Sequence, residues 1–113
     1  MKTYSGKRTT SGTVVLVDGR PLDPRLELRD FQAGFEWGYE GSGPSQLALA
    51  ILADHAGPER ALEGWKTFMQ TVVAELEGEQ WRLTSVEIDR RAESVAIVPM
   101  DLQTLLRKVR GES

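Results

Sequence analysis

A chain of 113 residues, 40% of them hydrophobic and 27% charged, has the size and composition of one folded domain with a substantial core. The absence of cysteine excludes disulfides and thiolate metal sites, and the net charge of −3 is mild. The longest uninterrupted apolar run, residues 47–53, is too short to cross a bilayer, and the N-terminus lacks the apolar segment of a signal peptide. We expect a soluble, cytoplasmic protein without a membrane partner.

The first third of the chain has the composition of β-strands. Residues 2–8 and the β-branched run 13–17 are predicted strands, and the Asp-Gly pair at 18–19 is a tight-turn signal. Prolines follow this turn closely, so a strand directly after it is short or lies at an edge. Leucines alternate with charged residues at 26–29, which predicts one further half-buried strand.

The next segment reads GFEWGYEGSGPSQLALAIL. Its aromatic residues Phe35, Trp37 and Tyr39 recur with period two, so on a strand they would share one face, with Glu36 and Glu40 on the other. Aromatic residues at strand period usually fill a core, and we expect Tyr39 to be the one that reaches the surface.

Two helices are predicted after this segment. Gly43 suits an N-cap and Pro44 a first helical position, and the helix would run to Ala56 with apolar residues on most sides. An amphipathic pattern over 58–76 predicts a second helix. The short Gly-Pro joint between the two helices indicates an αα-hairpin.

The C-terminal part contains one clear start signal. Thr84 and Glu87 have the spacing of a capping box, which predicts a short helix over 85–93. Beyond it, residues 95–98 are a candidate strand, and a final amphipathic helix begins near Asp101.

We therefore predict an α+β fold. Residues 2–93 would form a single domain in which a small antiparallel sheet packs against an αα-hairpin, with a short third helix. Residues 94–113 would form a C-terminal extension of one strand and one helix, which is also a candidate for pairing two subunits.

Charge is unevenly distributed along the chain. Residues 30–59 contain five carboxylates and neither lysine nor arginine, which favours a cation or a basic protein surface and disfavours nucleic acid. The candidates for binding are Glu36, Tyr39, Glu40, Ser42, Gln46 and Asp54. The residues assigned to the turn and the core are Phe35, Trp37, Gly41, Gly43 and Pro44. On this interpretation the glutamates leave an acidic strip on the surface.

No catalytic constellation is visible. The glycine-rich turn lacks the lysine of a phosphate-binding loop, and we interpret it as a strand-to-helix turn. Glu36 and Glu40 are two carboxylates without a further group of oxygen-bearing residues that could complete a metal site. His55 is the only histidine. We therefore expect neither an enzyme nor a metal or other cofactor.

Three stretches together resemble a known family. They read VDGRPLDPRLELRDF, GFEWGYEGSGPSQLALAILADH and WRLTSVEIDR, and the similarity spans residues 2–91. The family consists of small uncharacterised proteins of phages, plasmids and other mobile elements. It has no assigned activity, so it brings no catalytic residues, and it implies a mobile-element setting in which small acidic proteins bind host machinery.

The leading functional hypothesis is a non-enzymatic viral or mobile-element protein that binds a host protein or complex. An anti-defence inhibitor of the anti-CRISPR type is one such role. One alternative is a nucleic-acid-binding accessory protein that uses the aromatic residues or the basic cluster at 107–110. A second is a small metal-dependent hydrolase or nuclease that uses Glu36 and Glu40.

Overall fold

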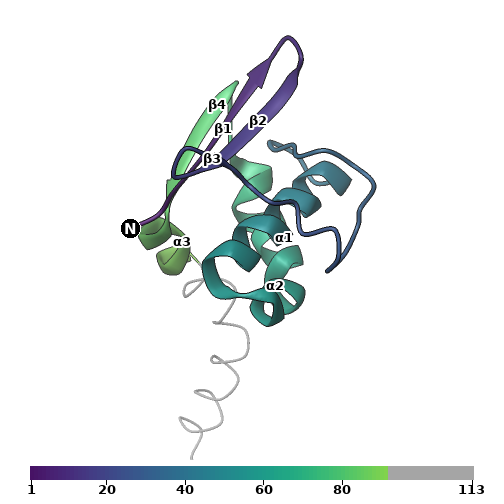
Figure 1. Cartoon of the computed structure of the whole chain (residues 1–113), viewed down its shortest axis with the longest axis vertical. Helices are drawn as coiled ribbons and strands as arrows, with labels where there is room; N and C mark the ends of the chain where they lie inside the picture. The colour runs from purple at the N-terminus through teal and green to yellow at the C-terminus, as the bar shows by residue number, and fades with distance from the viewer. Residues whose placement is uncertain (92–113) are drawn as a thin grey trace, which may run out of the picture.

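A four-stranded antiparallel sheet and a pair of helices make up most of the protein in the computed structural model, which describes residues 1–91. The strands are β1 (Thr3–Thr9), β2 (Gly12–Val17), β3 (Arg20–Pro21) and β4 (Gln80–Thr84). The helices are α1 (Ser42–Ala56), α2 (Pro58–Thr71), the 3-10 turn η1 (Val73–Glu75) and α3 (Ser85–Arg91). Figure 1 shows the sheet on one side of the α1–α2 pair. The predicted α+β fold is confirmed for the residues described.

The strand order is β3-β2-β1-β4, so the first strand lies in the interior of the sheet. Strands β1 and β2 form at the two predicted places and pair as a hairpin, and Asp18 and Gly19, both with positive φ, make the expected turn between β2 and β3. The two-residue length of β3 agrees with the nearby prolines. Strand β4 was not predicted, because Trp81 and Leu83 supply only two alternating apolar positions. It forms by pairing with β1, from which it is far removed in the sequence.

The predicted αα-hairpin is present, with two corrections. Helix α1 begins at Ser42 rather than Pro44, because the Ser45 hydroxyl and amide both bond the Gly41 carbonyl and close the first turn earlier. Helix α2 ends at Thr71 rather than at residue 76. The backbone leaves helical geometry at Val72 (φ −119°), and the tighter turn η1 follows.

Two predicted strands are wrong, because residues 22–41 form an irregular segment without strands. Near residues 26–29 the chain turns instead, since Arg25 has a φ of +58° and its carbonyl accepts the Leu28 amide. Across the aromatic segment, Gly38 has a φ of +88°, which interrupts an extended chain. The strict alternation of faces is therefore lost, and Trp37 is buried while Tyr39 is half exposed.

The core lies between the sheet and helix α1, which is buried along most of its length as predicted. Its largest fully buried side chains include Trp37, Tyr4, Phe68, Leu47, Leu49 and Ile51. The capping box is confirmed, since the Thr84 amide donates to Glu87 Oε1 at 3.0 Å and the Glu87 amide donates to Thr84 Oγ1 at 3.2 Å.

The predicted C-terminal strand and final helix lie outside the described residues, as does the end of the third predicted helix. Within residues 1–91, none of the helices has the length and hydropathy that a bilayer span requires.

Candidate functional site

Glu36 is partly exposed and forms an ion pair with Arg8. Arg8 Nη2, at the end of β1, lies 2.8 Å from Glu36 Oε1, and the same guanidinium donates to the carbonyls of Trp37 and Gly78 at 3.0 and 2.9 Å. Its Cζ also lies 4.4 Å from the centroid of the Trp37 ring. Glu36 is therefore neutralised and fastens the aromatic segment to the sheet.

Phe35 and Trp37, two of the three aromatic residues of the segment, contact the rest of the domain. Trp37 donates its indole N–H to the Gly78 carbonyl at 3.0 Å and packs edge-on against Trp81, with 5.7 Å between ring centroids. Phe35 is partly buried against the core, and its carbonyl accepts the Thr13 hydroxyl at 2.8 Å. These contacts suit packing, and the buried Trp37 ring is not available for stacking a nucleobase.

The glycine-rich turn is sterically required where it meets the aromatic segment. A Cβ on Gly43 would lie 2.8 Å from Glu36 Cβ and 2.9 Å from the Gly34 carbonyl oxygen. Gly43 and Pro44 are both buried. The turn is thus filled by the protein itself, which fits a structural role rather than an anion site.

Gln46, one of the predicted binding residues, is buried, with 1% of its surface exposed. Its Oε1 accepts the Phe31 amide at 2.9 Å, and its Nε2 donates to the carbonyls of Pro24 and Arg29 at 2.7 and 3.1 Å. One side-chain amide on α1 therefore anchors three points of the irregular segment. Its two donors and its carbonyl are occupied inside the protein.

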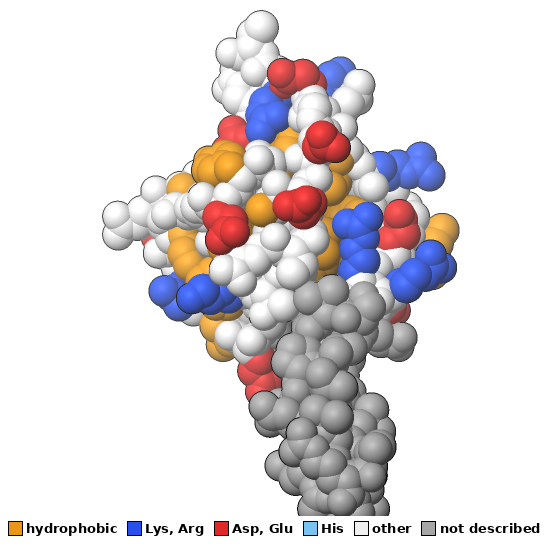
Figure 2. All heavy atoms as spheres, turned by 180° about the vertical axis from the view of Figure 1, so that it is seen from behind, with side chains coloured by type: hydrophobic (Ala, Val, Ile, Leu, Met, Phe, Trp, Pro, Cys, Tyr) orange, Lys and Arg blue, Asp and Glu red, His pale blue; other side chains and the backbone are white. Residues whose placement is uncertain are grey.

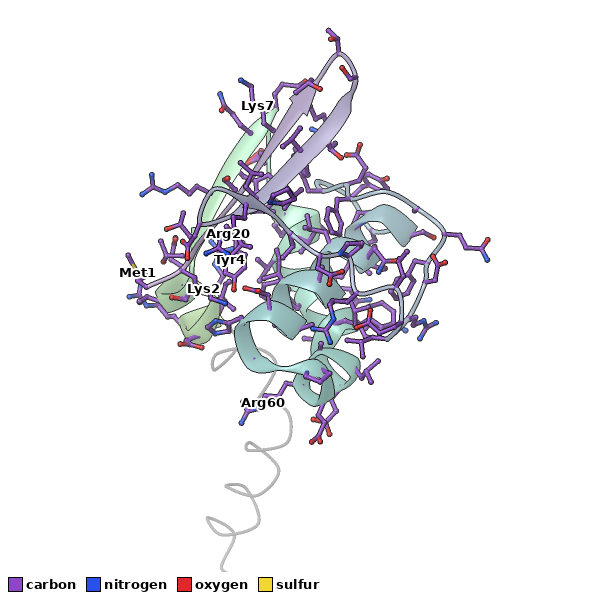
Figure 3. The ribbon with its side chains drawn as sticks, viewed as in Figure 1. Met1, Lys2, Tyr4, Lys7, Arg20 and Arg60 are labelled. Carbon is purple, nitrogen blue, oxygen red and sulfur yellow. The ribbon has the colours of Figure 1, made fainter. Side chains whose placement is uncertain are left out.

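Asp54 lies near the C-terminal end of α1 and contacts the beginning of β1. Its Oδ2 accepts the Tyr4 hydroxyl at 2.7 Å and lies 3.0 Å from Lys2 Nζ. Burial favours the neutral acid, but the hydrogen bonds from Tyr4 and Lys2 outweigh it and lower the pKa of Asp54. Burial, assisted by the Asp54 carboxylate, raises the pKa of Tyr4 far above its usual value. Figure 3 shows Lys2 and Tyr4 together at the start of β1.

The expected single acidic strip is therefore divided. Glu36 pairs with Arg8 at one end of β1, and Asp54 pairs with Lys2 at the other. The backbone positions of Lys2 and Arg8 are six residue steps apart along extended chain, which corresponds to about 20 Å. Glu36 and Asp54 each pair with a basic residue that is distant in the sequence, so these two of the five carboxylates in 30–59 do not contribute unpaired negative charge to the surface.

Three of the predicted binding residues do lie on the surface, at the entrance to α1. Tyr39 is 51% exposed, and Glu40 and Ser42 are exposed beside it in the sequence. Among the residues described, Tyr39 is the aromatic side chain with more than a third of its surface exposed. Its ring lies against Gly41, where a Cβ would approach Tyr39 Cε2 to 2.8 Å. The ring therefore packs on one side against the backbone of the turn, and its other side is exposed.

The residues on either side of Tyr39 contact η1 and the end of α2. The Gly38 amide donates to the Val73 carbonyl at 3.0 Å, and Glu40 Oε1 accepts Gln70 Nε2 at 3.3 Å. This places the aromatic segment against residues 73–76, which include the exposed Glu75 and are followed by the exposed Glu77.

We define the Tyr39 surface as the exposed residues Tyr39, Glu40, Ser42, Glu75 and Glu77. Its three glutamates form no ion pair with the residues that the structure describes. Glu75 and Glu77 were not among the predicted binding residues, because Glu75 fell at the end of the predicted helix 58–76 and Glu77 directly after it. The alternation of glutamates at 75, 77 and 79 was the available signal. Figure 2 shows acidic side chains interspersed with apolar ones on the rear face of the protein.

Other clusters of titratable groups are small. His55 Nε2 lies 2.6 Å from Asp89 Oδ1 and joins α1 to α3. Over residues 1–91, His, Asp and Glu side chains do not gather in any group of three or more that could hold a metal ion.

Residues 4–94 match the model of a family of unknown function, DUF6166, and the chain belongs to this family. The predicted membership of an uncharacterised family is thus confirmed, and the mobile-element setting stays a prediction. The chain matches no curated protein and no solved structure.

Proposed function

For this member of a family of unknown function, we propose a non-enzymatic role in which the protein binds another protein through the Tyr39 surface. The observation that supports it best is the exposed and positioned ring of Tyr39. The other two aromatic residues of the same segment pack against the core, and their contacts account for their positions.

The chemistry of the surface suits a protein contact. Tyrosine is enriched at the energetic centres of interfaces because it offers a large apolar area, a hydroxyl and few rotatable bonds. Its ring already packs against Gly41, so less side-chain freedom is lost on binding. The surrounding Glu40, Glu75 and Glu77 would provide a polar rim that attracts a basic partner surface.

The resemblance to mobile-element proteins directs the choice of partner. We propose a host protein complex, with a nucleic-acid-guided defence nuclease as the first candidate, which the protein would inhibit by occupying a basic surface. An acidic protein can compete for a surface that normally contacts nucleic acid, because both present negative charge.

The alternative of metal-dependent hydrolysis gains no support from the carboxylates first considered for it. Glu36 is bonded to Arg8 and Glu40 to Gln70, so each of them contacts a different neighbour.

The test compares tagged variants in host lysate treated with nuclease. Tyr39→Ala should weaken capture of the partner by about 30-fold, the equivalent of a 2 kcal/mol hot spot. Leu62→Ala is the matched control, since Leu62 is another exposed apolar residue, 47% exposed, on α2. It should retain the partner. Thermal unfolding of each variant checks that the fold is intact.

Two results would overturn the proposal. One is a partner that Tyr39→Ala and wild type capture equally, which would place the contact elsewhere. The other is a partner set that disappears with nuclease, which would move the function to nucleic acid.

A further inference from the structure

Strand β4 is an open edge of the sheet. Only β1 pairs with it among the described elements, and Figure 1 shows it at the outer side of the sheet. The Arg8 amide bonds the Glu79 carbonyl, and the Ser85 amide bonds the Lys2 carbonyl. Along an antiparallel strand, the main-chain N–H and C=O groups of successive residues point alternately to the two sides. Because Glu79 and Ser85 bond toward β1, the main-chain groups of Trp81 and Leu83 also point toward β1, and those of Gln80 and Arg82 point outward.

The two edges of the sheet differ in their protection. Strand β3 is two residues long and contains Pro21. Its short length and its proline both disfavour the addition of another strand. Strand β4 pairs with β1 over five consecutive residues without a bulge and contains no proline. Its outward main-chain N–H and C=O groups are therefore available to another strand.

The outer face beside this edge is positively charged. It forms a shallow hollow of about 550 Å³, and the residues that line it include Lys7, Gln80, Trp81 and Arg82. These residues include two cations and no carboxylate, although the whole chain carries a net charge of −3. Figure 3 shows Lys7 on the side of the sheet away from the helices. Local charge here is opposite in sign to that of the Tyr39 surface.

We propose that an extended, acidic segment of a partner protein adds to β4 as a fifth strand. The main-chain groups of Gln80 and Arg82 would bond the new strand, and its outward carboxylates would face Arg82, with Lys7 behind it. This edge site is separate from the Tyr39 surface and does not depend on it.

Charge decides among the possible occupants. If β4 paired with β4 of a second copy in antiparallel fashion, the two Arg82 side chains would come to opposite or neighbouring positions and repel each other. Nucleic acid would need stacking aromatic side chains, but Trp81 packs its ring inward against Trp37. An acidic strand satisfies both the free main-chain groups and the cations.

The test uses the full chain and two blocked peptides of about eight residues, a usual strand length. One alternates valine with glutamate and the other alternates valine with lysine. Fluorescence anisotropy gives their affinities, and amide signals of the isotope-labelled protein locate the contact. The glutamate peptide should bind at least about tenfold more tightly than the lysine peptide, because like charges on neighbouring strands repel. It should shift the Gln80 and Arg82 amide signals.

Two variants separate main-chain pairing from charge. Arg82→Pro removes an amide that β1 does not use, so it should abolish binding of the glutamate peptide. Arg82→Glu should reverse the preference between the two peptides and keeps the proposal testable if the proline variant fails to fold. Arg60→Glu is the control, because Figure 3 places Arg60 on the helices, far from Lys7. It should leave both affinities within about twofold of wild type, as expected for a distant surface charge.

Several outcomes would overturn the proposal. They are equal affinity for both peptides, retention of binding by a folded Arg82→Pro protein, and Gln80 and Arg82 amides already protected from exchange in the free chain. Tighter binding of a single-stranded oligonucleotide that is lost in Arg82→Glu would instead assign the face to nucleic acid. Tyr39→Ala should leave peptide binding unchanged, so failure at one surface is distinguishable from failure at the other.

Discussion

Replacing Gln46 by leucine should destabilise the domain strongly, although the substitution retains most of the side-chain volume. The variant loses three hydrogen bonds of 2.7 to 3.1 Å and leaves the Phe31 amide and the carbonyls of Pro24 and Arg29 without their partner. Each such bond contributes about 0.5–1.5 kcal/mol net, so the expected loss is about 2–4 kcal/mol. That is a large share of the roughly 5–15 kcal/mol by which a small domain is stable.

Urea unfolding followed by tryptophan fluorescence measures this loss, since Trp37 lies within the irregular segment and Trp65 packs edge-on against its Phe31. Hydrogen exchange at the Phe31 amide should accelerate, because its acceptor is removed. Gln70→Leu is the control: Gln70 is exposed and makes one longer bond of 3.3 Å to Glu40, so its effect should stay within about 0.5 kcal/mol.

A loss below about 1 kcal/mol in Gln46→Leu, similar to the control, would refute this reasoning. It would mean that the irregular segment is held by its other contacts. The buried amide would then need another explanation, such as a role in binding.

Two further predictions concern the sheet. The hydrogen bonds that Asp54 accepts outweigh burial and lower its pKa in the folded state, so its contribution to stability is present above the unfolded pKa of about 4 and is lost as pH falls through the lower folded pKa. The thermal unfolding temperature should therefore fall less steeply from pH 7 to pH 2 in Asp54→Asn than in wild type. The same fall in both proteins would contradict the stabilising role of the Asp54 carboxylate. A Cβ on Gly6 would overlap the Trp81 indole, so Gly6→Ala should cost about 1–3 kcal/mol in urea unfolding, whereas Gly34→Ala, where the space is open, should not; equal losses would argue against the overlap.

Features set by near neighbours could be predicted from the sequence. The capping box at Thr84 depends on a residue three positions on, and the turn at 18–19 depends on the tolerance of glycine for positive φ. The Gly57-Pro58 joint ends one helix and starts the next, again through local geometry. Local signals of this kind determined most of the elements and hence the fold class.

Features set by distant partners could not be predicted. Strand β4 has only five residues and forms because β1 accepts it in register, and that pairing has no signature within β4 itself. The alternation of Phe35, Trp37 and Tyr39 has the period of a strand, but this segment pairs with none of the described strands. In addition, Gly38 turns the chain between Trp37 and Tyr39.

The candidate site depends on the same distinction. Glu36 and Asp54 belong to a segment without basic residues, but each forms an ion pair with a cation at one end of β1. Their charges therefore stabilise contacts within the domain. Exposed charge remains where no such partner arrives: negative at the Tyr39 surface and positive beside Arg82. Because these surfaces lie on different elements and differ in sign, a basic partner that binds one is repelled by the other. Two partners, or one partner with a basic and an acidic part, would therefore be needed to occupy both, and substitutions at the two surfaces should act independently.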